Sequence, residues 1–245
     1  MKTKAHTTPA RLMTAVLALA ATACAGDQPE SDGAESRAAE DVARSATQEL
    51  METQRPEPID VTIMGYNMGN PDAARILVIE FSDYACGYCR RFHMETFKNL
   101  QRDFVQTGDV AWKYIPFELG IFSNGREGGV AGQCAAPQGR FFEMSDMLFD
   151  RQADWKNESE PNPVFVGFAR ELGLDAGAYE SCLVSAEAQS QIRFNTRVAQ
   201  QIGIRGTPTF FVNGFPLQGA LPEDVFREML TNALQEIGRS GGGAP

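Results

Sequence analysis

The sequence predicts an α/β fold with an all-helical insertion, and three observations lead to this prediction. First, residues 76–81 (ILVIEF) form a near-continuous apolar run, which is typical of a central strand buried on both faces. Second, residues 126–203 have helical periodicity and contain no convincing strand. Third, residues 207–220 (TPTFFVNGFPLQGA) return to β structure as two short strands, joined by the Asn213-Gly214 dipeptide that favours a tight hairpin turn.

The other elements are predicted in chain order from periodicity and end signals. Residues 61–64 (VTIM) are expected to form a first short strand, and residues 110–117 (VAWKYIPF) a later one. Between them, residues 87–106 have a helical pattern. One broad face of this helix carries Cys89, His93, Phe97, Leu100 and Phe104. A last helix is expected to start at Pro222, since proline suits a first helical position, and to end at Gly238.

The length of 245 residues suits one globular domain with an inserted subdomain. Residues 24–57 have too few large apolar residues to bury a core, so we expect a solvated tether with a coil dimension of about 30 Å. The predicted organisation is a signal peptide (1–23), this acidic tether (24–57), a main domain in two parts (58–125 and 204–238), an inserted helical subdomain (126–203) and a disordered tail (239–245).

The N-terminus is typical of an export signal. A basic start, residues 1–11, precedes an apolar run, residues 12–23, that is too short to span a bilayer. The sequence ATAC (21–24) resembles the bacterial lipobox, in which the cysteine is acylated, although Ala21 stands where leucine is usual. Ordinary cleavage with Cys24 incidental is the alternative. We expect an exported protein of the periplasm or cell envelope that is lipid-anchored through Cys24.

The charge balance excludes one class of partner. The formal net charge is −10. An acidic surface repels the phosphate backbone, so no nucleic-acid partner is expected.

The chain has five cysteines. If Cys24 is lipidated, the other four form two pairs and no thiol is left over. Cys134 and Cys182 both fall in the predicted helical insertion, and we expect them to form a structural disulfide in an oxidising compartment. A second exchange-active couple, or two free buried thiols, are the alternatives.

The stretch FSDYACGYCRRFH, residues 81–93, carries the other two cysteines two residues apart. Cysteines at this spacing reach each other when they share the first turn of a helix, with the first at the mouth and the second underneath. The unpaired N–H groups and the positive end of the helix dipole stabilise a thiolate at Cys86. Cys86 is therefore predicted to be the attacking sulfur, and Cys89 the sulfur that resolves the mixed disulfide.

A metal site is the alternative use of this stretch, because Cys86, Cys89 and His93 could supply three zinc ligands. Structural zinc prefers four ligands, and the sequence has no second motif of paired ligands. We expect a redox couple with no metal and no organic cofactor. His93 is expected either to be half-buried on the helix face or to tune the thiols.

These motifs together resemble the DsbA-like family of extracytoplasmic thiol:disulfide oxidoreductases. Residues 78–93 (VIEFSDYACGYCRRFH) are similar to its active-site stretch, and residues 134–149 (CAAPQGRFFEMSDMLF) to the start of its insert. Residues 203–214 (GIRGTPTFFVNG) resemble its cis-proline loop. The resemblance covers about residues 59–238. It implies a thioredoxin fold with an inserted helical domain, and an enzyme that exchanges disulfides with protein thiols.

The resemblance also assigns supporting residues. It implies a cis bond between Thr207 and Pro208 that faces the cysteines, a Glu80 beneath the active site and Lys113 as its neighbour. A buried carboxylate would assist release of the second cysteine as a thiolate by exchanging its proton; otherwise Glu80 is a polar break in a strand. Where some members have a second glutamate, this chain has His93, which departs from their charge network.

The direction of exchange is left open by the sequence. The dipeptide Gly87-Tyr88 and Thr207 resemble disulfide isomerases, but residues 25–57 are expected to be a tether in place of the isomerases' dimerisation domain. Oxidative protein folding is the expected function, with an isomerase or reductase, or a chaperone-like module with structural disulfides, as alternatives. The expected partners are exported client proteins with cysteines and a membrane or soluble redox partner that recycles the pair.

Overall fold

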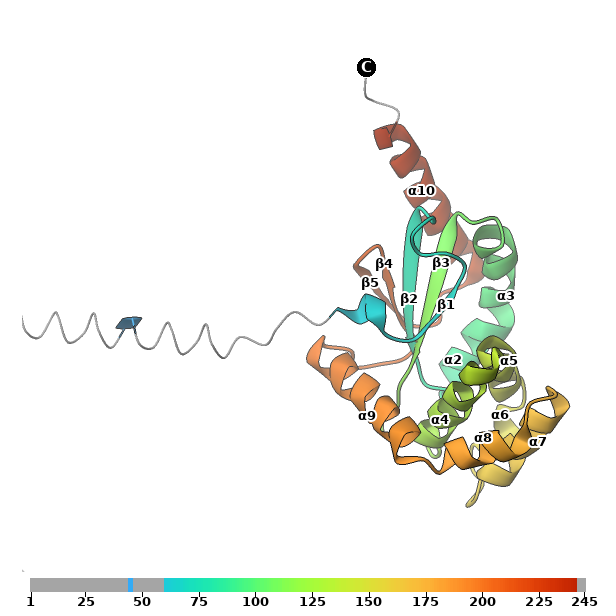
Figure 1. The fold of residues 1–245 in the computed structure, drawn as a ribbon. Helices are drawn as coiled ribbons and strands as arrows, with labels where there is room; N and C mark the ends of the chain where they lie inside the picture. Colours follow the sequence, from blue (N-terminus) through green and yellow to red (C-terminus); the bar gives the residue numbers. More distant parts are fainter. Residues whose placement is uncertain (1–43, 46–59, 242–245) are drawn as a thin grey trace, which may run out of the picture. The chain divides into compact units, whose positions relative to one another are not determined.

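The computed structural model describes residues 44–45 and 60–241 of the chain (Figure 1). The chain divides into two units, 1–57 and 58–245, and all the elements below belong to the second. The predicted signal peptide, Cys24 and nearly all of the predicted tether lie outside the described residues. No helix in the described part of the chain is long and apolar enough to cross a membrane.

A five-stranded mixed sheet has the strand order β1-β3-β2-β4-β5. At its centre, β2 (Ile76–Ser82) pairs in parallel with β3 (Val110–Pro116), and both predicted strands are confirmed. The antiparallel neighbours are β1 (Tyr66–Met68) against β3 and β4 (Thr209–Val212) against β2, with β5 (Phe215–Gln218) at the far edge. Nearly every residue of the two central strands is buried, which explains their continuous apolar character.

The strand predicted at residues 61–64 is wrong. Val61–Ile63 form a 3₁₀ turn, η1, and Asp60 stabilises it by accepting a hydrogen bond from the Thr62 N–H at 2.8 Å. The chain then turns at Gly65, with φ +68°, where a Cβ would lie 2.3 Å from a backbone oxygen of β3. A run of four residues is too short for its pattern to distinguish a strand from such a turn, and the Asp60 cap favours the turn.

The helix that follows β2 carries the predicted buried face. It comprises α2 (Gly87–Phe92), a π-helical turn η2 (His93–Phe97), α3 (Lys98–Leu100) and a second π-helical turn η3 (Gln101–Val105). The predicted face is confirmed as buried at Cys89, His93, Phe97, Leu100 and Phe104. This helix is the crossover between the parallel strands β2 and β3.

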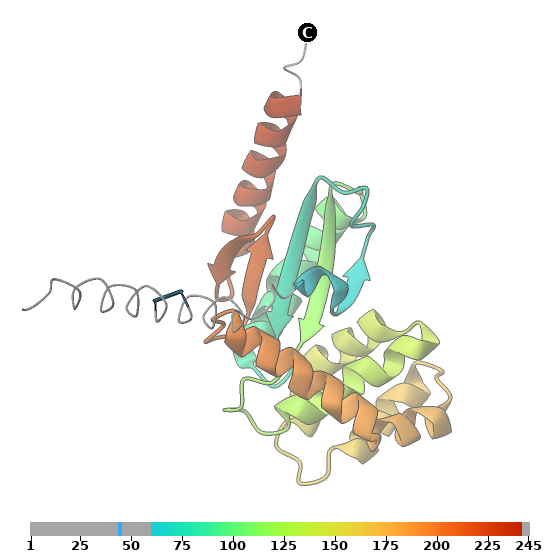
Figure 2. The ribbon, with the colours of Figure 1, turned by 60° about the vertical axis from the view of Figure 1, so that its left-hand side comes forward.

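Between β3 and β4 the described chain forms only helices and loops. The helices are α4 (Gly125–Ala135), η4 (Ala136–Gln138), α5 (Phe141–Asp150), α6 (Gln152–Trp155), α7 (Asn162–Glu171), α8 (Ala176–Leu183) and α9 (Ala186–Gln201). Figures 1 and 2 show α4 to α8 gathered at the end of the sheet where β2 finishes. Their core includes the fully buried Trp155, Phe165, Phe168 and Tyr179. The predicted α/β class with a helical insertion is confirmed.

The C-terminal part agrees with the predicted hairpin and extends the predicted helix. Asn213 and Gly214 both have positive φ, 46° and 88°, as the tight turn between β4 and β5 requires. The last helix, α10, spans Glu223–Gly241 and so passes the predicted end at Gly238. A glycine inside a helix costs about 1 kcal/mol but keeps its N–H, so it does not end the helix by itself.

Candidate active site

Cys86 and Cys89 lie where β2 passes into α2. Cys86 has an extended backbone and occupies the cap position just before Gly87, the first residue of α2. Its N–H donates to the Asp83 carbonyl at 3.0 Å, and its carbonyl accepts from the Arg90 N–H at 3.1 Å. Both cysteines are therefore in the first turn of the helix, as their spacing predicts.

The two thiols have opposite electrostatic environments. A hydrogen bond from Cys89 lowers the pKa of Cys86 to about 5, and hydrogen bonds from Thr207 and the N–H groups of Cys89 and Tyr88 add to this effect against the opposing effect of burial. Burial, followed by the proximity of Cys86, raises the pKa of Cys89 well above its ordinary value. At neutral pH the pair thus consists of a Cys86 thiolate and a Cys89 thiol.

A cis proline loop faces the first cysteine. The Thr207–Pro208 bond is cis, and the Cys86 Sγ lies 3.7 Å from the Thr207 carbonyl oxygen. The Pro208 carbonyl accepts from the Gly219 N–H at 2.8 Å, which joins the loop to the segment after β5. The structure therefore brings together Cys86 and the loop that the family resemblance assigned to it.

A polar cluster lies in the core beside Cys89. Glu80 is 1% exposed, and its Oε2 accepts a hydrogen bond from Trp112 Nε1 at 2.9 Å. Burial raises the pKa of Glu80 to about 7, while Trp112 and the Ser82 hydroxyl partly offset the rise. The Ser82 hydroxyl also acts on Cys89, whose pKa it lowers slightly. Three buried oxygens of this cluster, Glu80 Oε1, Ser82 Oγ and Tyr114 OH, have no hydrogen-bond partner within the described residues.

The implied position of Lys113 as the neighbour of Glu80 is wrong. In the register of β2 and β3, Glu80 lies opposite Tyr114, whereas Lys113 lies opposite Ile79. Since successive residues of a strand point to opposite faces, Lys113 and Glu80 lie on different faces of the sheet. The Lys113 Nζ donates instead to the Met64 carbonyl at 2.9 Å.

His93 connects the active-site helix with the helical insertion. It is 3% exposed, more deeply buried than the half-buried position predicted, and its Nε2 lies 2.6 Å from Asp146 Oδ1 of α5. Its ring packs near those of Phe97 and Phe149, with centroid separations of 5.2 and 4.6 Å. His93 Nδ1 is buried without a hydrogen-bond partner in the described structure. No group of three or more His, Cys, Asp or Glu that could hold a metal ion occurs among the described residues.

Asp83 is a buried charged residue of the site that the sequence reasoning missed. Its carboxylate accepts hydrogen bonds from the N–H groups of Ala85 at 2.9 Å and Leu119 at 2.8 Å. Burial raises the pKa of Asp83 to about 6, against these two hydrogen bonds, and the charge of Cys86 adds to the rise. A Cβ on Gly125 would lie 2.9 Å from the carboxylate oxygens, so glycine leaves room for it. An aspartate directly after a buried strand and three residues before Cys86 was the available signal.

Cys86 opens into a groove of about 610 Å³. The groove residues are Cys86, Gly87, Tyr88, Arg91, Leu119, Ile121, Phe122, Arg205, Gly206 and Thr207. Tyr88 and Ile121 are 61% and 73% exposed, so apolar surface faces solvent beside the reactive sulfur. An open groove with apolar walls and a few polar groups suits an extended polypeptide segment.

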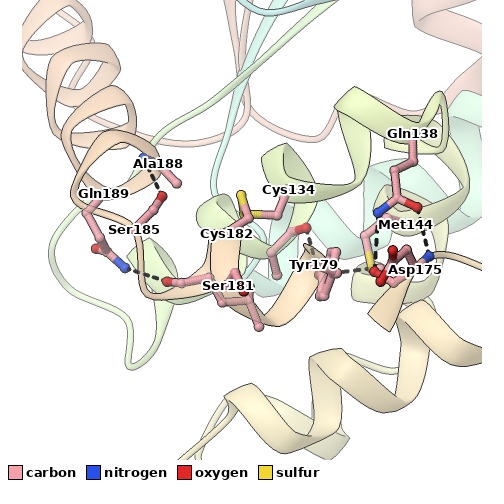
Figure 3. The surroundings of a disulfide bond; sticks show 12 residues. Cys134, Gln138, Met144, Asp175, Tyr179, Ser181, Cys182, Ser185, Ala188 and Gln189 are labelled. Carbon is pink, nitrogen blue, oxygen red and sulfur yellow. Dashed lines mark hydrogen bonds between the residues drawn. A yellow bond between two sulfur atoms is a disulfide. The ribbon is translucent and has the colours of Figure 1, made fainter. Parts of the chain in front are cut away.

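The second pair of cysteines lies in the helical insertion. A disulfide joins Cys134 of α4 to Cys182 of α8, with the Cα atoms 5.7 Å apart (Figure 3). The same two helices are held by Tyr179, whose hydroxyl donates to the Ala131 carbonyl at 2.8 Å. Near the other end of α8, Gln138 and Asp175 exchange two hydrogen bonds (Figure 3).

Comparison with known proteins gives one family match and several relatives. The family model described as Thioredoxin matches residues 62–232. A Na(+)/H(+) antiporter NhaA 1 of Salinispora arenicola is 27% identical over 164 residues, which are 67% of this chain and 24% of the antiporter. The chain thus spans about a quarter of that relative's length. Disulfide bond formation protein D of Bacillus subtilis is 23% identical over 180 residues, 71% of this chain and 79% of the relative.

Solved structures share the fold at low sequence identity. The oxidised BdbD of Bacillus subtilis has a TM-score of 0.63 at 23% identity and covers 72% of this chain and 95% of its own. The alpha-DsbA1 of Wolbachia pipientis has a TM-score of 0.63 at 20% identity, with coverages of 76% and 96%. This chain therefore has the predicted thioredoxin fold with a helical insertion, and it shares that fold with these proteins.

Proposed function

This chain belongs to the thioredoxin family, and from that premise we propose that it is an enzyme, a DsbA-like thiol:disulfide oxidoreductase that acts on protein thiols through Cys86 and Cys89. The observation that carries the proposal is the opposite shift of the two thiol pKa values, about 5 for Cys86 and well above the ordinary value for Cys89. A thiolate that lines an open groove, beside a protonated thiol that does not, is the arrangement that disulfide exchange requires.

In the oxidising direction, a client thiolate attacks Cys86 Sγ of the Cys86–Cys89 disulfide, and Cys89 leaves as a thiolate that takes up a proton. A second client thiolate then attacks the client sulfur of the mixed disulfide and displaces the Cys86 thiolate. The client loses two electrons and gains a disulfide, while the enzyme pair is reduced. The low pKa of Cys86 makes it a good leaving group and stabilises the reduced enzyme, which favours oxidation of the client.

The protein is proposed to work in oxidative protein folding, and its reduction potential tests this direction. DsbA lies near −120 mV and thioredoxin near −270 mV, so a thiol with a pKa of about 5 should place the couple above about −180 mV. Equilibration with glutathione buffers, followed by alkylation of free thiols, measures the potential. A value near that of thioredoxin would favour the reductase alternative, and a couple that resists reduction would favour a binding module with structural disulfides.

We propose that Glu80 accepts the proton of the Cys89 thiol and returns it, and that the Ser82 hydroxyl transfers the proton between the two groups. The Ser82 hydroxyl lies beside both groups and influences the pKa of each. A carboxyl with a pKa of about 7 is close to half-ionised at neutral pH, so it can both accept and return a proton.

We expect the rate at which Cys89 resolves a mixed disulfide to rise with pH around a midpoint of about 7, because only the ionised Glu80 accepts the thiol proton. In Glu80→Gln this rise of the rate with pH should disappear. Stopped-flow release of a labelled peptide from the mixed disulfide measures it. The matched control is Glu95→Gln, at an exposed glutamate on the helix that begins at the two cysteines, which should retain the pH-dependent rise in rate.

Stability provides an independent check of Glu80. Its pKa is higher in the folded chain than in the unfolded one, so its contribution to folding is lost as pH rises through about 7. At alkaline pH, Glu80→Gln should therefore exceed the unaltered protein in free energy of unfolding, by up to about 3 kcal/mol. If Glu80→Gln changes neither the pH dependence of the resolution rate nor the free energy of unfolding, the assignment of Glu80 is wrong.

The proposed location and partners rest on the sequence. We propose that the chain is exported, that Cys24 is its lipid-anchored mature N-terminus, and that cysteine-containing exported proteins are its clients. A membrane or soluble redox partner is proposed to recycle the pair. Mass spectrometry of the mature N-terminus tests the anchor, since an unmodified terminus would exclude it.

A further inference from the structure

Two arginines supply the positive charge of the groove described above. Arg91 comes from α2, and Arg205 comes from the segment before the cis proline, far along the chain from α2. Both side chains are exposed, and every other residue of the groove is uncharged apart from the Cys86 thiolate. The groove is therefore a cationic site in a chain whose formal net charge is −10.

Neither arginine forms an ion pair with a carboxylate in the described part of the chain. The Arg91 guanidinium lies over the Tyr88 ring, 5.0 Å from its centroid. Arg205 Nη1 donates to the backbone carbonyls of Gln200 and Ile204, at 3.3 and 3.4 Å. By contrast, Arg126 nearby pairs with Glu118 at 2.6 Å. Both groove guanidinium groups thus keep donors free for an incoming anion.

The uncharged part of the groove affects how strongly a bound anion would interact with the two arginines. Its apolar lining consists of Tyr88, Leu119, Ile121 and Phe122, and a segment bound there would displace water from these side chains. An ion pair formed beside such walls is screened less than one in open solvent. Acidic client segments are therefore attracted to the groove, and basic segments are repelled from it.

Resting on the proposed function, we infer that Arg91 and Arg205 select client segments that carry an aspartate or glutamate beside the reacting cysteine. The occupant is an extended polypeptide whose cysteine meets Cys86, whose apolar side chains contact the walls, and whose carboxylate binds one of the two guanidinium groups.

The test compares three peptides that differ only beside their single cysteine, where they carry glutamate, glutamine or lysine. Stopped-flow kinetics with the oxidised full chain measure the rate of exchange with each peptide. A neighbouring charge also changes the peptide's own thiol, so each rate is divided by the rate of that peptide with a small neutral disulfide. In this ratio the glutamate peptide should exceed the glutamine peptide by about threefold, and the lysine peptide should fall below it by a similar factor.

The variants distinguish the effect of the two groove arginines from the effect of the net charge of the protein. In Arg91→Gln and in Arg205→Gln the glutamate-to-lysine ratio should fall, and in the double variant it should approach one. The control is Arg170→Gln in α7, an exposed arginine outside the groove, which should keep the ratio of the unaltered protein. Raising the salt concentration to about 0.5 M should reduce the preference in the unaltered protein.

The outcomes distinguish this inference from the function on which it rests. If the unaltered protein exchanges with all three peptides at equal normalised rates, the client preference is overturned and the exchange activity stands. If the preference exists but survives in the double variant, its assignment to Arg91 and Arg205 is overturned. If no peptide exchanges, the proposed function itself fails.

Discussion

Cys86→Ser abolishes disulfide exchange, whereas in Cys89→Ser the Cys86 thiolate attacks a client disulfide, displaces one client sulfur as a thiolate and keeps the other in a mixed disulfide that cannot be resolved. Cys86 is the sulfur that faces the groove, and its lowered pKa keeps it reactive at neutral pH. Cys89 is fully buried, so a client cannot reach it, but it lies within reach of Cys86. Without it, the mixed disulfide has no internal thiol to resolve it.

The measurement is incubation with a disulfide-containing client, followed by non-reducing electrophoresis and mass spectrometry of the crosslinked peptide. Cys89→Ser should give a covalent product linked through Cys86, and Cys86→Ser should give none. Circular dichroism of both variants confirms that they remain folded. If mild alkylation labels Cys89 before Cys86, or if the trapped product is linked through Cys134 or Cys182, the assigned roles are wrong.

The double variant Cys134→Ser, Cys182→Ser loses stability but keeps its activity per folded molecule. The disulfide closes a loop with a sequence separation of 48, and loop-closure entropy gives a loss of about 4 kcal/mol in the free energy of unfolding. For a domain of this size that loss corresponds to a fall in melting temperature of roughly 10 °C. The Tyr179 hydrogen bond between the same helices remains, so the insertion should keep its fold.

Urea unfolding and thermal melting measure the effect, and exchange with a reduced client measures activity. Since Cys134 is buried, the serine hydroxyl could add a cost of its own, and Cys134→Ala with Cys182→Ala serves as the matched control. Mild reductant should open Cys86–Cys89 before Cys134–Cys182. Loss of exchange activity with an unchanged melting temperature would instead identify a second redox couple.

Local patterns in the sequence predicted most of the secondary structure. The two central strands follow from short apolar runs and the Asn213-Gly214 turn from backbone preference, and the structure contains each of them. The failures came where local signals allow two conformations. Residues 61–64 are too few to separate a strand from a 3₁₀ turn, and Gly238 is compatible with both a helix end and a helix interior.

The environment of the charged residues could not be predicted in this way. Lys113 and Glu80 lie on opposite faces of the sheet because of the register between β2 and β3, and register is a relation between two distant segments. The contact of Asp83 with Leu119 likewise joins residues 36 apart. No pattern within either segment contains that information.

The sequence by itself determined that two thiols begin a helix at the end of a buried strand, because strand burial and helix start depend on neighbouring residues. Only the tertiary structure decided how those thiols differ and what they face. The Thr207 carbonyl that meets Cys86 lies 121 residues away in the chain, and Cys89 is desolvated by burial in the folded chain. Desolvation and hydrogen bonding set the two pKa values, and both depend on groups that folding alone brings together.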